Sequence, residues 1–357
     1  MKSLGFFKTN SSDSTQNISL SKLNIGINDI GNFILRLDKD RSIDYIIDKV
    51  CDHAGGRLIV KGEQAICPMH DWRLNLNNLN YNNDTCKKSL DYKLIDKNTI
   101  EISDSNKHLS NPFKHLAKGN VKFRWLNHAT IHIQCGETSI ITDPWLFGPA
   151  FLTGWWLATP SPKDSIELLK NADYVYISHN HPDHLHPETL ALLSKDKTIL
   201  APNFKSKSCQ KYLSSLGFTN IHQLDFKEIF ELSPTLQVSI LKSGDFRDDS
   251  GIYICADGYE FLLTVDSNFL NGYVLPQNID FLMSSFAGGA SGFPLCYSSF
   301  SEEEKQNILN RNRNAVKFSV GKNIDAVKPK YYLPYAGMFK EKGTRDGYIL
   351  NLNTKNS

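Results

Sequence analysis

The sequence predicts an α+β protein of two domains, an all-β module followed by a larger mixed α/β domain. Three observations support this fold class. The chain has 357 residues, about twice a common domain size. Its first third holds short β-type runs with hardly any helical periodicity, and strand and helix patterns alternate from about residue 121 onward. We therefore divide the chain into a polar N-terminal segment (1–30), a first module (31–115) and a second domain (116–357).

The first module is expected to consist of strands, because apolar and β-branched residues occur in short runs between Gly, Asp and Asn turns. The predicted strands are Phe33–Leu37, Ile43–Ile47, Leu58–Lys61, Gln64–Cys67 and Thr99–Ile102. A polar stretch from Ser103 to Gly119, containing Ser, Asn, Pro and Gly, predicts the linker to the second domain. The domain boundary should lie near residue 115.

The second domain is expected to mix strands and helices. Helical periodicity predicts helices over Pro187–Ser194 and Lys205–Leu216. The clearest helix runs from Glu302 to about Val316, because Ser301 stands in an N-cap position with Glu304 three residues later. The predicted strands are Val121–Trp125, Thr130–Cys135, Thr138–Asp143, Asp173–Ser178, Thr198–Ala201, Leu236–Lys242, Gly251–Ala256 and Glu260–Val265.

Charge and composition argue against several classes of partner. The chain has 40 basic and 38 acidic side chains, a net charge of +2, and no single-sign block long enough for a nucleic-acid tail. Its longest apolar runs are too short and interrupted to cross a bilayer. Met1–Ser19 lacks the apolar core and cleavage site of a secretory signal. We expect a cytoplasmic protein that binds neither nucleic acid nor membrane.

Two of the seven cysteines stand in a spacing that suits a metal better than a disulfide, one with a histidine on each of two predicted loops. The pattern is Cys51-Asp-His53, thirteen intervening residues, then Cys67-Pro-Met-His70. Two thiolates and two imidazoles suit a Rieske [2Fe–2S] cluster, in which imidazoles on one iron raise the reduction potential. A structural Cys2His2 zinc site and four unrelated residues are the alternatives, but the interleaved order and the all-β setting favour a Rieske module. The remaining cysteines are expected to be free thiols: Cys86, Cys135, Cys209, Cys255 and Cys296.

A second cluster of ligand-type residues follows the apolar strand Asp173–Ser178. Three imidazoles and a carboxylate emerge at the carboxyl end of that strand, in the sequence His179-Asn-His181-Pro-Asp183-His184. Spacing alone indicates only a dense set of metal ligands. The HxHxDH pattern resembles that of metallo-β-lactamase-fold proteins. The resemblance implies a metallo-β-lactamase-like αββα sandwich over residues 116–357, with the first two histidines on one metal and the Asp-His pair on a second.

Further candidate residues lie where that fold would place them. Asp266, at the end of a late strand, is the candidate bridging carboxylate, while His128 and Asp143 have either a chemical role or only a packing or capping role. The fold's usual third-position histidine would fall in Ser243–Asp249, where the chain has Asp245, Asp248 and Asp249. A mixed His/carboxylate set with an open position is typical of oxygen-activating iron sites. The metal-ligand candidates are His179, His181, Asp183, His184, Asp245 and Asp266, and the catalytic candidates are Asp183, Asp245 and His128.

Taken together, the order of the two motifs resembles the CMP-N-acetylneuraminate hydroxylase family, the CMP-sialic acid monooxygenases. The resemblance runs from about residue 40 to residue 340. Two departures are visible: Asp245 stands where the family has a histidine, and members of the family are longer at the C-terminus. Similar blocks include Asp143-Pro-Trp-Leu-Phe-Gly-Pro-Ala-Phe151, Gly154-Trp-Trp156, Thr264-Val-Asp266, Phe286-Ala-Gly-Gly-Ala-Ser-Gly-Phe-Pro294 and Pro334-Tyr-Ala-Gly337.

This resemblance implies an iron-dependent monooxygenase. An electron donor, such as a ferredoxin or a cytochrome b5-like carrier with its reductase, would reduce the [2Fe–2S] cluster, which passes electrons to mononuclear or dinuclear iron that activates O2. The substrate would be a CMP-sialic acid-like nucleotide sugar or an amine. A metal-dependent hydrolase of the phosphodiesterase or lactonase type with an accessory Rieske module and a plain electron carrier remain alternatives. Candidate substrate contacts are Gly288, Gly289, Ser291 and Trp155, with a packing role as the other interpretation.

Overall fold

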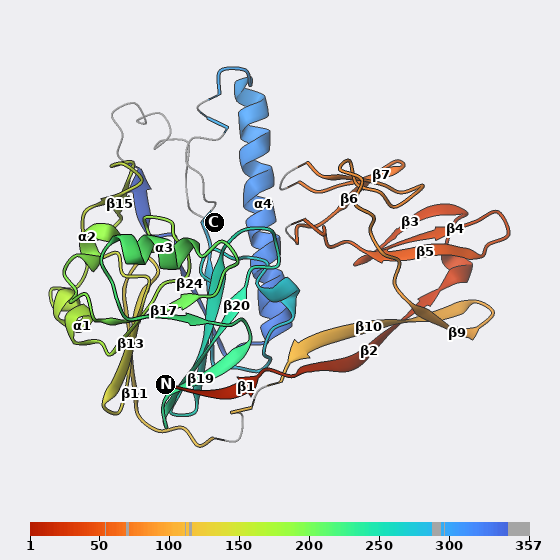
Figure 1. Ribbon diagram of the computed structural model, residues 1–357. Helices are drawn as coiled ribbons and strands as arrows, with labels where there is room; N and C mark the ends of the chain where they lie inside the picture. The colour runs from red at the N-terminus through yellow and green to blue at the C-terminus, as the bar shows by residue number, and fades with distance from the viewer. Residues whose placement is uncertain are drawn as a thin grey trace.

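A computed structural model of the chain describes residues 1–53, 55–68, 71–110, 112–113, 116–287, 294–295 and 297–341. It shows a small β module on one side and a larger domain with two facing sheets on the other (Figure 1). No helix in these ranges combines the length and the apolar character that crossing a membrane requires.

The module consists of two small antiparallel sheets. One contains β3 (Gly26–Ile30), β4 (Phe33–Leu37) and β5 (Ile43–Asp48), and the other β6 (Ile59–Lys61), β7 (Gln64–Ile66) and β8 (Arg73–Asn75). Ile34 and Ile47 of the first sheet pack with Ala65 and Leu74 of the second in one buried cluster. Four of the five predicted strands are therefore confirmed in these two sheets, as β4, β5, β6 and β7, and β3 and β8 are additional.

A long antiparallel ribbon connects the module to the second domain. In it, β10 (Thr99–Leu109) pairs with both β2 (Thr9–Ser19) and β9 (Tyr92–Asp96), and a short 3-10 helix, η1 (Leu20–Lys22), follows β2. Figure 1 shows β2 and β10 running side by side between the two parts of the molecule. The expectation of a linker from Ser103 was wrong, because the backbone pairing with β2 carries β10 through that polar stretch to Leu109.

The N-terminal segment is also more structured than its polar composition indicates. Strand β1 (Lys2–Phe6) pairs antiparallel with β19 (Glu228–Ser233) and so extends a sheet of the second domain. Residues 1–30 therefore contribute strands to three different sheets. A strand at the edge of a sheet satisfies its backbone through one neighbour only, so a weakly apolar sequence is sufficient there.

Two sheets form the centre of the second domain. The seven-stranded sheet has the order β1, β19, β20 (Leu236–Lys242), β21 (Ser250–Ala256), β22 (Tyr259–Leu263), β23 (Phe281–Ser285) and β24 (Tyr331–Tyr335). The six-stranded sheet has the order β11 (Val121–Asn127), β12 (Thr130–Cys135), β13 (Thr138–Thr142), β16 (Tyr174–Tyr176), β17 (Thr198–Pro202) and β18 (Ile221–Leu224). A small third sheet contains β14 (Pro149–Ala150), β15 (Trp155–Leu157) and β25 (Phe339–Glu341).

Helices cover the outer faces of both sheets, which gives four layers. Alternate residues of the strands point inward, so that Ile133 and Ile140 of one sheet meet Val238 and Ile254 of the other. The opposite face of the six-stranded sheet packs against α1 (Ser165–Asn171), α2 (Pro187–Leu190) and α3 (Ser208–Ser215), and that of the seven-stranded sheet against α4 (Glu302–Val327). The arrangement agrees with the predicted αββα sandwich.

Helix α4 begins as predicted and runs well beyond Val316. Ser301 accepts a hydrogen bond from Glu304 N, and the Glu304 side chain accepts one from Ser301 N, which completes the capping box. The helix ends only where Lys328 adopts a left-handed conformation. Its length matters because the extra turns reach the module, where Arg57 lies over the Phe318 ring at 5.9 Å.

The module contacts the second domain through the loop that follows β5 and contains Gly55. Tyr273, in the 3-10 helix η2 (Asn271–Tyr273), donates a hydrogen bond to Gly55 O at 3.3 Å. Gly55 has φ +69°, and a Cβ there would lie only 2.5 Å from the Phe269 ring, so glycine is required by both conformation and space. A polar cavity of about 340 Å³ lies beside this contact, between Arg57 of the module and Lys322 of α4.

Candidate metal centre and cluster-binding loops

The HxHxDH residues form a tight turn where β16 ends. His184 N and Leu185 N both donate to His181 O, at 3.0 and 2.8 Å. This turn buries His179, Asp183 and His184 and leaves His181 exposed. Since the strand is parallel to its neighbours β13 and β17, the turn lies at the carboxyl edge of the sheet, next to the loop that follows β13.

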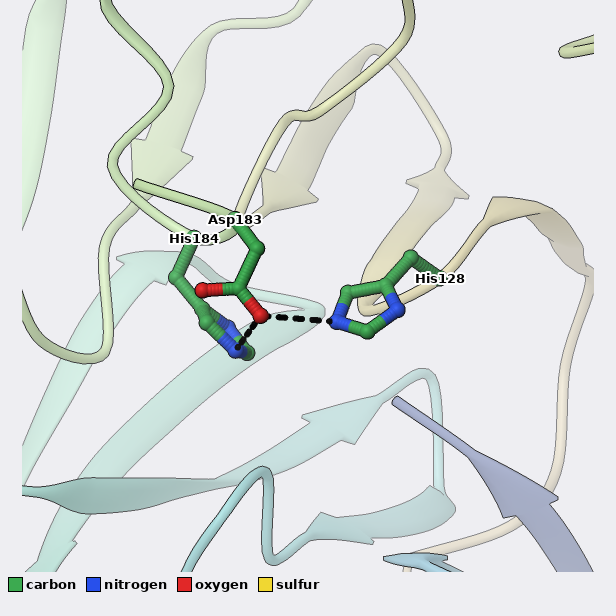
Figure 2. Close-up of side chains that lie close together, drawn as sticks. All are labelled: His128, Asp183 and His184. Atoms are coloured by element: carbon green, nitrogen blue, oxygen red, sulfur yellow. Dashed lines mark ion pairs between the residues drawn. The ribbon is translucent and has the colours of Figure 1, made fainter. Parts of the chain in front are cut away.

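One group of potential ligands contains His128, Asp183 and His184 (Figure 2). His128 Nε2 lies 3.3 Å and His184 Nε2 3.5 Å from the same oxygen, Asp183 Oδ2. Among the described side chains, His128 Nε2, Asp183 Oδ1 and His184 Nε2 are buried without a hydrogen-bond partner. Such atoms are costly to bury unless something coordinates them, so the group fits a metal ion.

A second group contains His179, His181 and Asp266. His179 Nε2 lies 2.8 Å from His181 Nδ1 and 3.8 Å from Asp266 Oδ2. The other oxygen of the same carboxylate, Asp266 Oδ1, lies 3.5 Å from His184 Nε2. Asp266 thus faces both groups, one oxygen to each, as a carboxylate that bridges two metal ions does.

Asp143 orients His184 from behind. Its carboxylate accepts hydrogen bonds from Ser178 N and Ser178 Oγ, both at 2.7 Å, and lies 3.1 Å from His184 Nδ1. A carboxylate only accepts, so His184 Nδ1 carries a proton, and Nε2 on the other side of the ring faces Asp183 and Asp266. Of the two roles left open for Asp143, the structure supports orientation of a ligand.

Several residues around the centre hold backbone conformations that side chains rarely adopt. His128, Asp143, Val265 and Ala336 have φ of +36°, +39°, +55° and +54°. Ala336 N donates to His128 O, and Val265 N donates to Tyr335 Oη, so these loops fix one another. Backbone strain that surrounding structure maintains is common at functional sites.

The charges in the centre perturb one another. Burial lowers the pKa of His184, but Asp183 and Asp266 outweigh it and hold that pKa well above its usual value. Burial and the neighbouring His184 lower the pKa of His179 well below its usual value. Burial and Asp266 raise the pKa of Asp249 to about 8. Buried carboxylates and imidazoles that shift one another in this way mark a functional site.

The loop 243–249 places its three aspartates differently. Asp245 pairs with Arg247 at 2.8 Å and lies outside both ligand groups, while Asp248 accepts a hydrogen bond from Ser206. Asp249 is the one that faces the centre, with Oδ1 3.6 Å from His179 Nδ1. The carboxylate nearest the centre is therefore Asp249, whereas the sequence analysis had chosen Asp245 from the three aspartates of this loop.

The two cysteine loops of the module are built alike. Gly55 N donates to Cys51 O at 2.9 Å, and Asp71 N donates to Cys67 O at 3.0 Å. Both cysteines are buried in the same apolar cluster. The His53 ring stacks on Trp72 at 4.3 Å and faces Phe246 of the second domain at 5.4 Å. The loops thus bring Cys51, Cys67 and His53 into one region, whereas His70 lies outside the described residues.

The other predicted positions divide into two sets. Trp155 is buried in an aromatic cluster and stacks on Phe339 with 3.7 Å between the ring centroids. The Phe339 ring lies 5.8 Å from the His128 ring. The Phe151 ring lies 6.0 Å from the His181 ring. Gly288, Gly289, Ser291 and Cys296 lie outside the described residues. Within the described part of the chain, four of the predicted free thiols are in no disulfide: Cys86, Cys135, Cys209 and Cys255.

Comparison with known proteins identifies relatives of most of the chain. Residues 122–248 match a β-lactamase superfamily domain. The cytidine monophosphate-N-acetylneuraminic acid hydroxylase of Mus musculus is 33% identical over 91% of this chain and 59% of its own length, and that of Xenopus laevis is 35% identical over 86% and 55%. The chain thus spans less than two thirds of the length of these relatives.

Among solved structures, CmlA, a diiron β-hydroxylase from Streptomyces venezuelae, is 17% identical with a TM-score of 0.44 over 62% of this chain and 45% of that one. The sequence relatives are of the kind that the motifs resemble, which confirms the resemblance. The chain is a homologue of the cytidine monophosphate-N-acetylneuraminic acid hydroxylases over most of its own length, and it contains a β-lactamase superfamily domain.

Proposed function

We propose that this chain is an iron-dependent hydroxylase that acts on a CMP-linked N-acetylneuraminic acid or a similar nucleotide sugar. Asp266 carries the proposal, because one carboxylate faces two groups of nitrogen and oxygen ligands. Such mixed sets suit iron, and the relatives are named as hydroxylases of that compound. Iron bound there would supply the redox chemistry that activates O2.

Electrons would enter through a Rieske [2Fe–2S] cluster on Cys51, His53, Cys67 and His70. The matching turns at the two cysteines support this assignment, since each presents one buried thiol at the start of a tight loop. The chain's own contribution is geometric: the turns fix the thiols, and Trp72 fixes the His53 ring. A ferredoxin or a cytochrome b5-like carrier would act as the donor.

Within the second domain the residues have separate roles. His128, Asp183 and His184 would hold one metal ion, His179 and His181 a second, and Asp266 both. Asp143 keeps the His184 ring in place. Phe151, Trp155 and Phe339 form an aromatic wall near His181 and His128.

A metal-dependent hydrolase is the second candidate. One observation favours it, because two metal ions bridged by a carboxylate also suit hydrolysis by a metal-bound hydroxide. In that case zinc would occupy both groups, and the module's cluster would have no catalytic role. The two functions therefore differ in metal content and in the need for O2.

Metal analysis and spectroscopy separate the two candidates. We expect anaerobically purified protein to contain about four irons per chain, two in the cluster and two in the centre. After dithionite reduction its EPR spectrum should show a Rieske-type signal, and O2 uptake should require CMP-N-acetylneuraminic acid, with cytidine monophosphate as the control. Zinc in the centre together with hydrolysis that needs no O2 would overturn the proposal.

A further inference from the structure

The loop 243–249, between β20 and β21, lies between the two candidate centres. On one side the Phe246 ring stacks on His53 at an interplanar angle of 10°, and the charges of Asp245 and Arg247 both act on His53. On the other side, Asp249 lies 3.6 Å from His179. A single short loop therefore touches a candidate cluster ligand and a candidate metal ligand.

Within this loop, charged groups form a continuous row. Asp245 Oδ2 lies 2.9 Å from Arg247 Nε and 2.8 Å from Arg247 Nη2, an end-on contact of two nitrogens with one oxygen. On its other edge, Arg247 Nη1 lies 3.8 Å from Asp249 Oδ2. The opposite oxygen, Asp249 Oδ1, faces His179 Nδ1. The guanidinium thus bridges two carboxylates, one on the His53 side and one on the His179 side.

The loop is held in this conformation from both ends. Lys242 Nζ donates to Asp245 O and Arg247 O, at 3.3 and 3.0 Å. Gly244 N donates to Phe269 O at 2.7 Å, and the ring of that same phenylalanine packs against Gly55 in the Cys51 loop. A shift of the module relative to the second domain would therefore move the loop as well.

We propose that Arg247, with Asp245 and Asp249, is a positioning bridge that couples the Cys51/His53 loop electronically to the His179 side of the metal centre. This inference rests on the proposed function. In each transfer one electron leaves the reduced cluster and one arrives at the metal centre, with an external one-electron donor as the original source. The guanidinium stays protonated, so it remains a hydrogen-bond donor toward both carboxyl groups throughout. The Arg247 side chain is 43% exposed, so its ion pairs should contribute little to the free energy of unfolding.

The test uses the full chain loaded with iron and an Arg247→Gln variant. A photoexcited deazaflavin reduces the protein in a flash, and EPR of rapidly frozen samples follows the decay of the reduced cluster as the electron moves on. We expect transfer to slow by about tenfold in Arg247→Gln, with Arg247→Lys recovering part of the rate. Arg124→Gln, which removes an exposed Arg–Asp pair with Asp164, is the matched control and should transfer at the wild-type rate.

Three measurements make the result decisive. The Rieske-type signal, the iron content and the melting temperature of Arg247→Gln should equal those of the wild type. A wild-type transfer rate in Arg247→Gln would overturn the bridge and leave the proposed function standing. Slow transfer that is explained by loss of iron from the centre would also overturn the bridge. Absence of any Rieske-type signal in the wild-type chain would instead overturn the proposed function.

Discussion

The two candidate centres differ in how the chain assembles them. Cys51 and Cys67 start two similar turns, one after β5 and one after β7, and the packing of the module's two small sheets brings both cysteines into one buried cluster. The metal centre draws on three separate segments, the loop after β11, the turn after β16 and the end of β22. Its geometry depends on sheet topology, and no single segment encodes it.

Their electrostatic surroundings differ as well. The cysteines lie among apolar side chains such as Leu58 and Leu74. The metal centre instead gathers buried carboxylates and imidazoles that shift one another's pKa. A substitution in the metal centre should therefore change the local charge and the metal coordination. A substitution in the module should instead change the reduction potential of the cluster or the packing of the core.

The largest effect is expected from Asp266→Ala, because this carboxylate serves both ligand groups. The iron of the centre should be lost and substrate-dependent O2 uptake should fall by more than about a hundredfold, beyond the range of outer-shell changes. The Rieske-type EPR signal should persist, since the module is untouched. Asp225→Ala, at an exposed aspartate of the same domain, is the control. Retention of the full iron content would contradict a bridging role.

His53→Cys sharpens the comparison from the other side. A third thiolate should preserve a [2Fe–2S] cluster but lower its reduction potential, because thiolates donate more charge to iron than imidazoles do. Turnover should nearly cease while the iron of the metal centre remains. Potentiometric EPR titration and metal analysis measure both quantities, with His222→Cys, on β18, as the control. An unchanged potential would remove His53 from the ligand set.

Asp143→Asn should have an intermediate effect. An amide at this position can turn its NH2 group toward His184 Nδ1, which removes the acceptor that fixes the ring. We expect the affinity for the metal at the His128 group to fall by about 10- to 100-fold. Competition with a chelator measures this affinity, and a melting curve monitors the fold. Unchanged metal affinity would show that the Ser178 and His184 contacts are only structural.

Sequence patterns predicted the fold best where strands are buried. Thr130–Cys135 and Leu236–Lys242 were predicted with the observed bounds, since buried strands give runs of apolar residues that few other structures match. Strand β2 was missed because it is rich in Ser, Thr and Asn, and its pairing with β10 is set by the backbone. The pairing of β1 with β19 joins distant parts of the chain and leaves no local signal.

The same division applies to the metal centre. The HxHxDH turn and Asp266 were candidates because each comes within a few residues of the end of an apolar strand. His128 approaches the same oxygen of Asp183 as His184 does because the loop after β11 meets the turn after β16, and sequence spacing does not reveal that meeting. Asp245 was chosen over Asp249 because it aligns with a histidine of the resembled family, but the loop conformation directs Asp245 to Arg247 and Asp249 to His179.

The smallest effect concerns Lys87, which ties down the loop that carries Cys51. Its side chain is only 4% exposed, donates to Val50 O at 2.8 Å, and pairs with Asp48 and Asp52 at 3.0 and 2.9 Å. Because those carboxylates are 40% and 48% exposed, water can solvate them when the lysine is removed. Lys87→Met should therefore lower the free energy of unfolding of the module by about 2 kcal/mol, below the cost of breaking a fully buried pair.

The pH dependence provides the check. Burial lowers the pKa of Lys87, but Asp48 and Asp52 outweigh it and raise that pKa above its usual 10.5. A raised pKa in the folded state means that the stabilisation is complete below pH 10.5 and is lost as the pH rises through the folded value. Denaturation followed at increasing alkaline pH should show this loss in the wild type and not in Lys87→Met. An equal alkaline loss in both proteins would mean that the lysine contributes packing rather than charge to the Cys51 loop.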